Sequence, residues 1–233
     1  MTPAGVGVIL AGVTLPGHEV GARRDAYLRA VLARHTAEAR LVVERALHDG
    51  MSVGDVYLEV FAPVLHEVGH QWAIGELNVA EEHYATAVTQ ELISALAARM
   101  RVPPRGGRLA VVTGTPGELH ALGPRMVGDF LEGDGWEVIQ LGASTPAADL
   151  AELVDSECPD VVALSTATAR SLPGIAEVVQ GLQALTPRPL VAVGGQFWTT
   201  QTSRAAHDLG VDIVARDPRM LVAILRDRVP ARE

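Results

Sequence analysis

A glutamate and a histidine two residues apart stand in the segment GTPGELHALG, residues 114–123, directly after a short apolar run at 109–113. A neutral imidazole donates a lone pair to a metal most effectively when a carboxylate holds its other ring N–H. His120 is therefore a candidate metal ligand, and Glu118 is the carboxylate that would orient it. A single loop histidine is more often solvated or structural than a ligand, so this interpretation depends on the rest of the chain.

The elements around this loop are predicted by a change of hydrophobic period after residue 108. Short apolar, β-rich runs alternate with helical patterns, which is typical of a parallel sheet wrapped by helices. The runs lie at 109–113, 137–141, 161–165, 190–194 and 211–215. We expect a five-stranded flavodoxin-like or Rossmann-like domain over 108–233, with its ligand in the loops beyond the carboxyl ends of the strands.

The first hundred residues have a helical period instead. Apolar residues predict one helix over 27–47 and a second that starts at Ser52, bends at Pro63 and ends near Trp72. Asn78 and Glu81 have the spacing of a capping box and predict a third helix that continues to Met100. We therefore expect a helical bundle over 1–100, followed by a proline- and glycine-rich linker over 101–107.

Composition excludes several classes of protein. With 233 residues, 48% of them hydrophobic and 20% charged, the chain is long enough for two folded domains and unlike a disordered one. A single cysteine, Cys158, excludes an internal disulfide. The net charge of -9 and the lack of a Lys/Arg cluster argue against direct binding of nucleic acid. No apolar run approaches the roughly 20 residues of a membrane span, so we expect a cytoplasmic protein without membrane contact.

The spacing of several motifs resembles the cobalamin-binding domain family, whose pattern is Asp-x-His-x-x-Gly, Ser-x-Leu and Gly-Gly. Here the matching residues, separated by 41 and 26 residues, are Glu118-x-His120-x-x-Gly123, Ser165-Thr166-Ala167 and Gly194-Gly195. The resemblance implies that His120 is the lower axial ligand of cobalt. It also implies that the nucleotide tail of the cofactor lies along Ser165, Thr166, Gly194 and Gly195.

Two positions depart from the family pattern. Glu118 replaces the usual aspartate, and we expect it to keep the hydrogen bond to the histidine. Ala167 replaces leucine, which is expected to loosen packing on the tail. An alternative for Gly194-Gly195 is a simple turn.

The helical half resembles the cap of methionine synthases, corrinoid methyl carriers and CarH-type light-sensing repressors. The phrase WAIGELNVAEEH places Trp72 ahead of Glu82 and His83, as in the photoreceptor subgroup. That resemblance implies that Trp72 covers the adenosyl group on the upper face of the cofactor, with Glu82 and His83 beside it. The alternative is that Trp72 is a core residue and that Glu82 and His83 form a solvated first turn.

Other features separate the chain from those repressors. Ala73 follows Trp72 where the repressors have a histidine that captures cobalt after photolysis, so only His70 and His83 are nearby substitutes. No helix-turn-helix module is recognised. The light signal is therefore expected to pass to a downstream protein or to change self-association in a homo-oligomer. The chain also resembles the photocobilins, which implies a second, bilin chromophore such as biliverdin, held noncovalently because Cys158 is a poor attachment point.

These observations predict a light-sensing, adenosylcobalamin-binding regulatory protein rather than an enzyme. The alternatives are a corrinoid methyl carrier for a methyltransferase system and a cobalamin storage or delivery protein. Among the remaining residues, Trp198 is expected to make a helix-start contact, with packing beside the nucleotide tail as the alternative. His66 and His207 are expected to be surface or packing residues. Hydroxyls at the strand ends that are candidates for binding the cofactor belong to Thr113, Thr115, Thr166 and Thr168.

Overall fold

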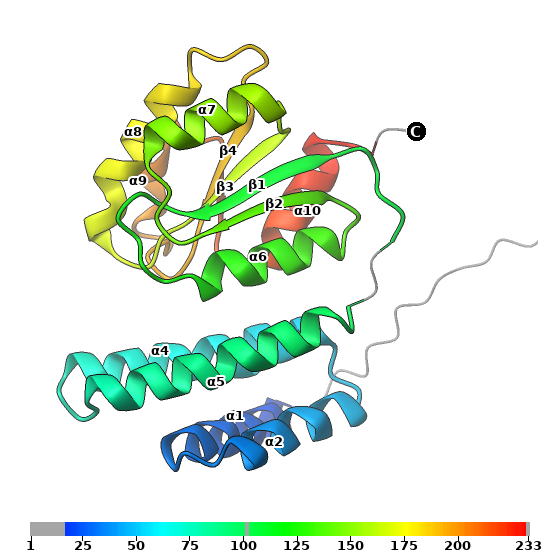
Figure 1. Ribbon diagram of the computed structural model, residues 1–233, viewed down its shortest axis with the longest axis vertical. Coiled ribbons are helices and arrows are strands. Elements are labelled where there is room, and N and C mark those ends of the chain that lie inside the picture. Colours follow the sequence, from blue (N-terminus) through cyan, green and yellow to red (C-terminus); the bar gives the residue numbers. More distant parts are fainter. Residues whose placement is uncertain (1–16, 101–102, 232–233) are drawn as a thin grey trace, which may run out of the picture. The chain divides into compact units, whose positions relative to one another are not determined.

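A computed structural model describes residues 17–100 and 103–231, and the chain divides into the compact units Met1–Arg99 and Met100–Glu233 (Figure 1). The first unit is helical throughout its described part. Its elements are α1 (Gly17–Leu32), α2 (Thr36–His48), α3 (Val53–Asp55), the π-helix η1 (Val56–Phe61), α4 (Ala62–Ala73) and α5 (Val79–Ala97).

The prediction of one helix over 27–47 is wrong, because α1 and α2 are separate. Arg34 takes a left-handed conformation with φ of 61°. The N–H of His35 donates to the carbonyl of Ala30 at 2.9 Å, and that of Arg34 to Val31 at 3.1 Å. This pair of bonds is a Schellman helix end, which normally carries glycine. No glycine or proline marks the break, so the periodicity alone did not reveal it.

The second predicted helix begins as expected at Ser52 and deforms ahead of Pro63. The Ser52 hydroxyl accepts from the N–H of Asp55 at 3.0 Å, which confirms the N-cap. Pro63 has no N–H to donate to the carbonyl four residues earlier, that of Glu59. The Arg24 guanidinium donates to this carbonyl at 3.0 Å. The predicted bend is thus realised as the π-helix over 56–61.

The capping box at the start of α5 is confirmed. The Asn78 side chain accepts from the N–H groups of Ala80 and Glu81, and the Glu81 carboxylate accepts from the N–H of Asn78 at 3.0 Å. Aromatic rings fill the core of this unit, with Tyr27 and Phe61 centroids 5.0 Å apart. The capping box therefore fixes the residue at which α5 begins, and the aromatic side chains form the packed interior of the helical unit.

The second unit is a five-stranded, fully parallel sheet in the order β2-β1-β3-β4-β5. The strands are β1 (Leu109–Gly114), β2 (Glu137–Gly142), β3 (Val161–Ser165), β4 (Leu190–Gly194) and β5 (Ile213–Ala215). The helices are α6 (Leu122–Glu132), α7 (Ala147–Glu157), the 3-10 turn η2 (Ala169–Ser171), α8 (Leu172–Leu182), α9 (Ser203–Asp208) and α10 (Pro218–Arg228). The predicted fold class is confirmed, and only the fifth strand begins later than expected.

Helices cover both faces of the sheet (Figure 1). Side chains of α7, α8 and α9 pack on one face around Val111, Val162 and Val191. Those of α6 and α10 pack on the other face around Val112 and Val161. Because both faces are covered, the central strands β1, β3 and β4 read as nearly continuous apolar runs.

The strand order also positions the candidate site. The chain passes from β1 to β2 on one side and then returns to β3 on the other side of β1. The connections after β1 and β3 therefore diverge at a topological switch point. In open α/β sheets, such a point is where a ligand-binding crevice is expected, beyond the carboxyl ends of the strands. Within the described ranges, no helix is long and apolar enough to cross a membrane.

Candidate functional site

The loop that carries the predicted ligand joins β1 to α6 and is tied to the end of β3. The N–H of Thr115 donates to the carbonyl of Ser165 at 3.0 Å. The hydroxyls of Thr115 and Thr166 lie 2.8 Å apart. The two connections that diverge at the switch point are therefore joined at their bases, beside the crevice.

The carboxylate of Glu118 is buried and holds the imidazole of His120. The side chain of Glu118 is 2% exposed, whereas that of His120 is 66% exposed. One carboxylate oxygen accepts from His120 Nδ1 and from the His120 backbone N–H. The other accepts from the N–H of Ala167 at 2.8 Å and from the Ser171 hydroxyl at 3.4 Å. The longer glutamate arm thus keeps the hydrogen bond expected of the family's aspartate.

The protonation of Glu118 determines which ring nitrogen of His120 is free. Burial raises the pKa of the Glu118 carboxyl. Hydrogen bonds from the Ala167 N–H, the His120 ring and the His120 N–H together lower it by a larger amount, so the pKa lies below its ordinary value. Glu118 is consequently a carboxylate at neutral pH and accepts the Nδ1 proton. The lone pair of a neutral His120 is then on Nε2.

The predicted glycines lie close to the same strand ends. A Cβ on Gly123 would meet the Ser165 hydroxyl at 2.7 Å, and one on Gly195 would meet the Thr166 backbone. A Cβ on Gly194 would be 2.8 Å from the carbonyl of Ala215. Neighbouring backbone atoms therefore leave no room for a side chain at Gly194 and Gly195, whereas at Gly123 the obstacle is the Ser165 hydroxyl. A role against a nucleotide tail stays a prediction.

The threonines at the strand ends differ in accessibility. Thr166 has no exposed surface and its hydroxyl is engaged by Thr115, so its side chain joins two loops. Thr113 is likewise buried and bonds the Thr145 hydroxyl at 2.8 Å. Of the four, only Thr168 is exposed.

Ser171 is a site residue that sequence reasoning missed. Its hydroxyl reaches Glu118 only because the connection after β3 turns through η2 back toward the β1–α6 loop. No spacing or residue type near Ser171 indicates this contact.

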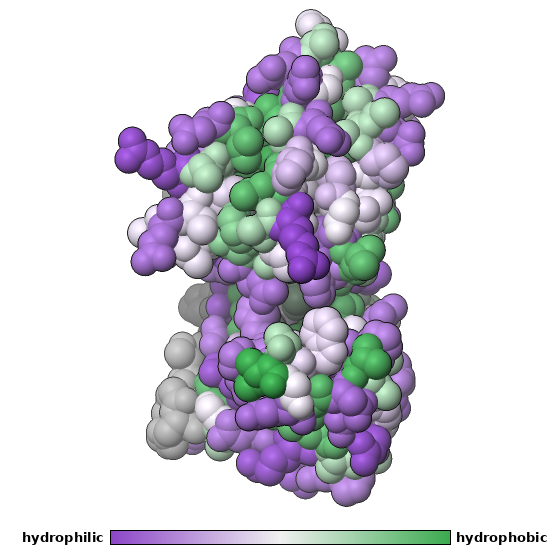
Figure 2. All heavy atoms as spheres, turned by 90° about the vertical axis from the view of Figure 1, so that its left-hand side faces the viewer, coloured by the Kyte–Doolittle hydropathy of each residue, from purple (hydrophilic) through white to green (hydrophobic). Residues whose placement is uncertain are grey.

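The residues predicted to cover the cofactor belong to α4 and α5 of the helical unit. Trp72 is 50% exposed, so it is not a core residue of that unit. Ile74 and Val79, in and after the turn that joins the two helices, are also more than half exposed. Figure 2 looks onto this end of the helical pair, where apolar side chains appear among polar ones. The Glu82 carboxylate accepts from the Thr86 hydroxyl at 2.8 Å, and His83 is exposed.

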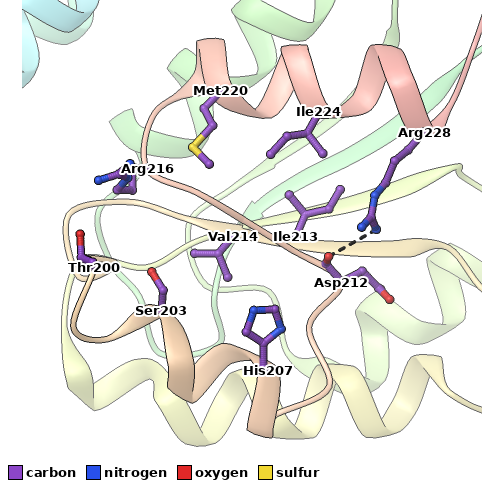
Figure 3. A pocket seen from close by; sticks show the side chains of 10 residues that line it. All are labelled: Thr200, Ser203, His207, Asp212, Ile213, Val214, Arg216, Met220, Ile224 and Arg228. Atoms are coloured by element: carbon purple, nitrogen blue, oxygen red, sulfur yellow. Dashed lines mark hydrogen bonds between the residues drawn. The ribbon is translucent and has the colours of Figure 1, made fainter.

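Other predicted side chains lie outside this arrangement. Trp198 is buried in the core with side chains of α7, α8 and α9, five residues before α9 begins. The expected helix-start contact stays a prediction. Burial lowers the pKa of His66. His207 lines a groove of about 380 Å³ between α9 and α10 alongside β5 (Figure 3). None of the ten residues lining that groove is a predicted cofactor residue.

The described ranges 17–100 and 103–231 hold no group of three His, Cys, Asp or Glu side chains that would bind a metal by themselves. A metal held by His120 would need further ligands, and the described residues do not supply them as a group. An exposed, oriented imidazole at the switch point of a parallel sheet therefore suits a metal that arrives inside an organic cofactor. Fold and site together define a flavodoxin-like α/β domain with one candidate metal ligand, His120, at the switch point of its sheet.

Comparison with known proteins identifies the family. A B12 binding domain model matches residues 108–224, and a second model, also of a B12 binding domain, matches 23–97. The chain belongs to the B12-binding family.

Curated relatives fall into two groups. The transcriptional repressors CarA and CarH of Myxococcus xanthus are 36% and 37% identical over 78% and 59% of this chain, which spans 62% and 46% of their lengths. Dimethylamine corrinoid protein 1 of Methanosarcina acetivorans is 25% identical, with 90% of this chain and 92% of that protein covered. The solved Methanosarcina barkeri monomethylamine corrinoid protein shares the fold, with a TM-score of 0.75 and 15% identity over 90% of this chain and 99% of that one.

Proposed function

We propose that this protein is a light-sensing regulator that binds adenosylcobalamin with Nε2 of His120 as the lower ligand of cobalt. One observation carries the proposal: an imidazole that is 66% exposed while its Nδ1 is held by a carboxylate that is 2% exposed. The free lone pair of such an imidazole points away from the carboxylate that holds the ring. Because the ring is already oriented, little further conformational entropy is lost when it binds a metal. The donor set therefore fits a corrinoid.

Each predicted residue has a role in this proposal. Glu118 orients the imidazole by accepting its Nδ1 proton, and Ala167 and Ser171 hold Glu118. Gly123, Ser165, Gly194 and Gly195 line the path of the nucleotide tail, and Thr166 secures that path from inside. Trp72, Glu82 and His83 contact the adenosyl group, for which the exposed indole offers a flat apolar surface.

When bound, the cofactor supplies a cobalt–carbon bond that light breaks. The protein supplies binding, orientation and a response in its helical unit. The resemblance to CarH-type repressors and the 36% and 37% identity with CarA and CarH support the regulatory role. Output passes to a protein partner or to self-association, and a noncovalently bound bilin is a further component that the photocobilin resemblance suggests.

A corrinoid methyl carrier is the second candidate function. It is supported by dimethylamine corrinoid protein 1, which is 25% identical over 90% of this chain. A carrier would hold cobalamin through the same His120 but would exchange a methyl group with partner enzymes.

The test is reconstitution in darkness with adenosylcobalamin, followed by absorption spectra before and after green light. We expect the spectrum to change irreversibly in the natural protein, and the signature of imidazole ligation to be lost in His120→Ala. His207→Ala is the matched control, because His207 is an exposed histidine in the groove beside β5.

Two results would contradict the sensor. Methyl transfer from a corrinoid methyltransferase in darkness, without a response to light, would establish the carrier. Tight binding of cobalamin with neither methyl transfer nor a response to light would indicate a storage or delivery protein. Expression with a biliverdin source tests the bilin, because a bound bilin adds a red-absorbing band.

A further inference from the structure

The loop after β2 contains a backbone conformation that is costly for its residue type. Among the described residues, three other than glycine have positive φ: Arg34, Ser144 and Cys158. Arg34 follows the end of α1, and Cys158 caps α7, positions where a left-handed residue is common. Ser144, with φ of 31°, instead follows a strand, β2. Strain of this kind persists where surrounding contacts require it, and it occurs often at functional sites.

The strained residue touches the loop that carries His120. The N–H of Gly117, three residues before His120, donates to the Ser144 hydroxyl at 2.9 Å. Gly117 itself has φ of +84°. The Ser144 hydroxyl is therefore a side-chain support for the first half of the β1–α6 loop.

Two further contacts hold Ser144 at this position. A Cβ on Gly114 would lie 3.0 Å from the Ser144 backbone nitrogen, so the end of β1 and the loop after β2 are in close approach. The hydroxyl of the next residue, Thr145, lies 2.8 Å from that of Thr113 on β1. The strained conformation is thus maintained by packing on β1 as well as by the bond to Gly117.

From these contacts we infer that Ser144 is a positioning residue for His120. In the sheet, β1 lies between β2 and β3. The β1–α6 loop is held from the β3 side through Glu118 and the N–H of Ala167, and from the β2 side through Ser144. Glu118 fixes the orientation of the imidazole ring, and Ser144 fixes the loop backbone that sets its position over the crevice. This inference rests on the proposed role of His120 as a cobalt ligand.

Removing the hydroxyl should loosen ligation while leaving uptake nearly intact. Ser144 is not among the residues proposed to line the nucleotide tail, so Ser144→Ala should still bind the corrinoid. The ratio of His120-ligated to unligated cobalt should fall about fivefold, the effect of losing one ordinary hydrogen bond.

The experiment is electron paramagnetic resonance of protein loaded with cob(II)alamin, using natural protein and protein labelled with 15N-histidine. The nitrogen splitting measures the ligated fraction, which a loss of stability elsewhere would not change. Ser156→Ala is the matched control, because its hydroxyl bonds only the Leu153 carbonyl on α7. Ser144→Gly removes both hydroxyl and strain and is expected to match Ser144→Ala. If ligation in the natural protein is too complete to quantify, the same substitutions are compared in a Glu118→Gln background.

The outcomes separate the two proposals. Unchanged ligation in Ser144→Ala, or ligation in Ser144→Gly equal to that of the natural protein, overturns the role of the Ser144 hydroxyl but leaves His120 as the ligand. Lack of histidine splitting in the natural protein overturns the ligand assignment, and the inference about Ser144 falls with it.

Discussion

At the scale of single residues, Glu118 connects the candidate ligand to the interior. Its two oxygens receive donors from its own loop and from the connection after β3, although the side chain is almost completely buried. Hydrogen bonds from these donors favour the ionised carboxylate, since protonation would put a proton on an oxygen that faces N–H or O–H donors. Ligand orientation and local stability therefore depend on the same charge.

This coupling predicts a defined pH dependence. The pKa of Glu118 is lower in the folded than in the unfolded chain, so its stabilisation is complete above the ordinary value of about 4.3 and is lost as pH falls through the folded pKa. Glu118→Gln should lower the free energy of unfolding at pH 7 by about 2 kcal/mol. Urea unfolding of both proteins between pH 7 and pH 3 should show this difference constant above the ordinary pKa of a glutamate, about 4.3, and shrinking as the pH falls below it.

The matched control is Glu152→Gln on the exposed side of α7. It should leave stability within about 0.5 kcal/mol at every pH. A difference for Glu118→Gln that grows on acidification would contradict the assigned ionisation.

At the scale of elements, the start of α5 determines where two proposed cofactor residues lie. Glu82 and His83 are in its first turns, directly after the Asn78–Glu81 capping box. Asn78→Ala should lower the free energy of unfolding by about 1 kcal/mol, because two N–H groups lose their acceptor. Thermal unfolding measures the change, and Gln90→Ala on the exposed face of the same helix should have almost no effect. An equal loss in both variants would indicate a general effect of helix truncation.

At the scale of the whole molecule, the acidic net charge of -9 disfavours direct binding of nucleic acid, and we propose that the light signal passes to a protein partner or to self-association. If self-association is that output, sedimentation velocity should detect about a doubling or halving of mass between dark and illuminated adenosylcobalamin-loaded protein. Protein loaded with hydroxocobalamin, which lacks the adenosyl group, is the control and should not change under light. Identical sedimentation in all samples would leave a separate protein partner as the route of output.

Local signals predicted a large part of this protein. The caps at Ser52 and Asn78, the apolar strands and the exposed position of His120 all follow from short stretches of chain, because helix caps, strand period and strand-end loops depend on neighbouring residues. The break at Arg34 did not follow, because a left-handed residue without glycine has no local signature.

Contacts between strand ends were decided by the tertiary structure alone. Ser171 and Ser144 lie 53 and 27 residues from the loop residues that they support. The sequence by itself determined which residue has the chemistry of a ligand. The order of the parallel strands β2, β1 and β3 decided which side chains hold His120 in place, because only sheet pairing brings loops that are distant in sequence to the same edge of the sheet.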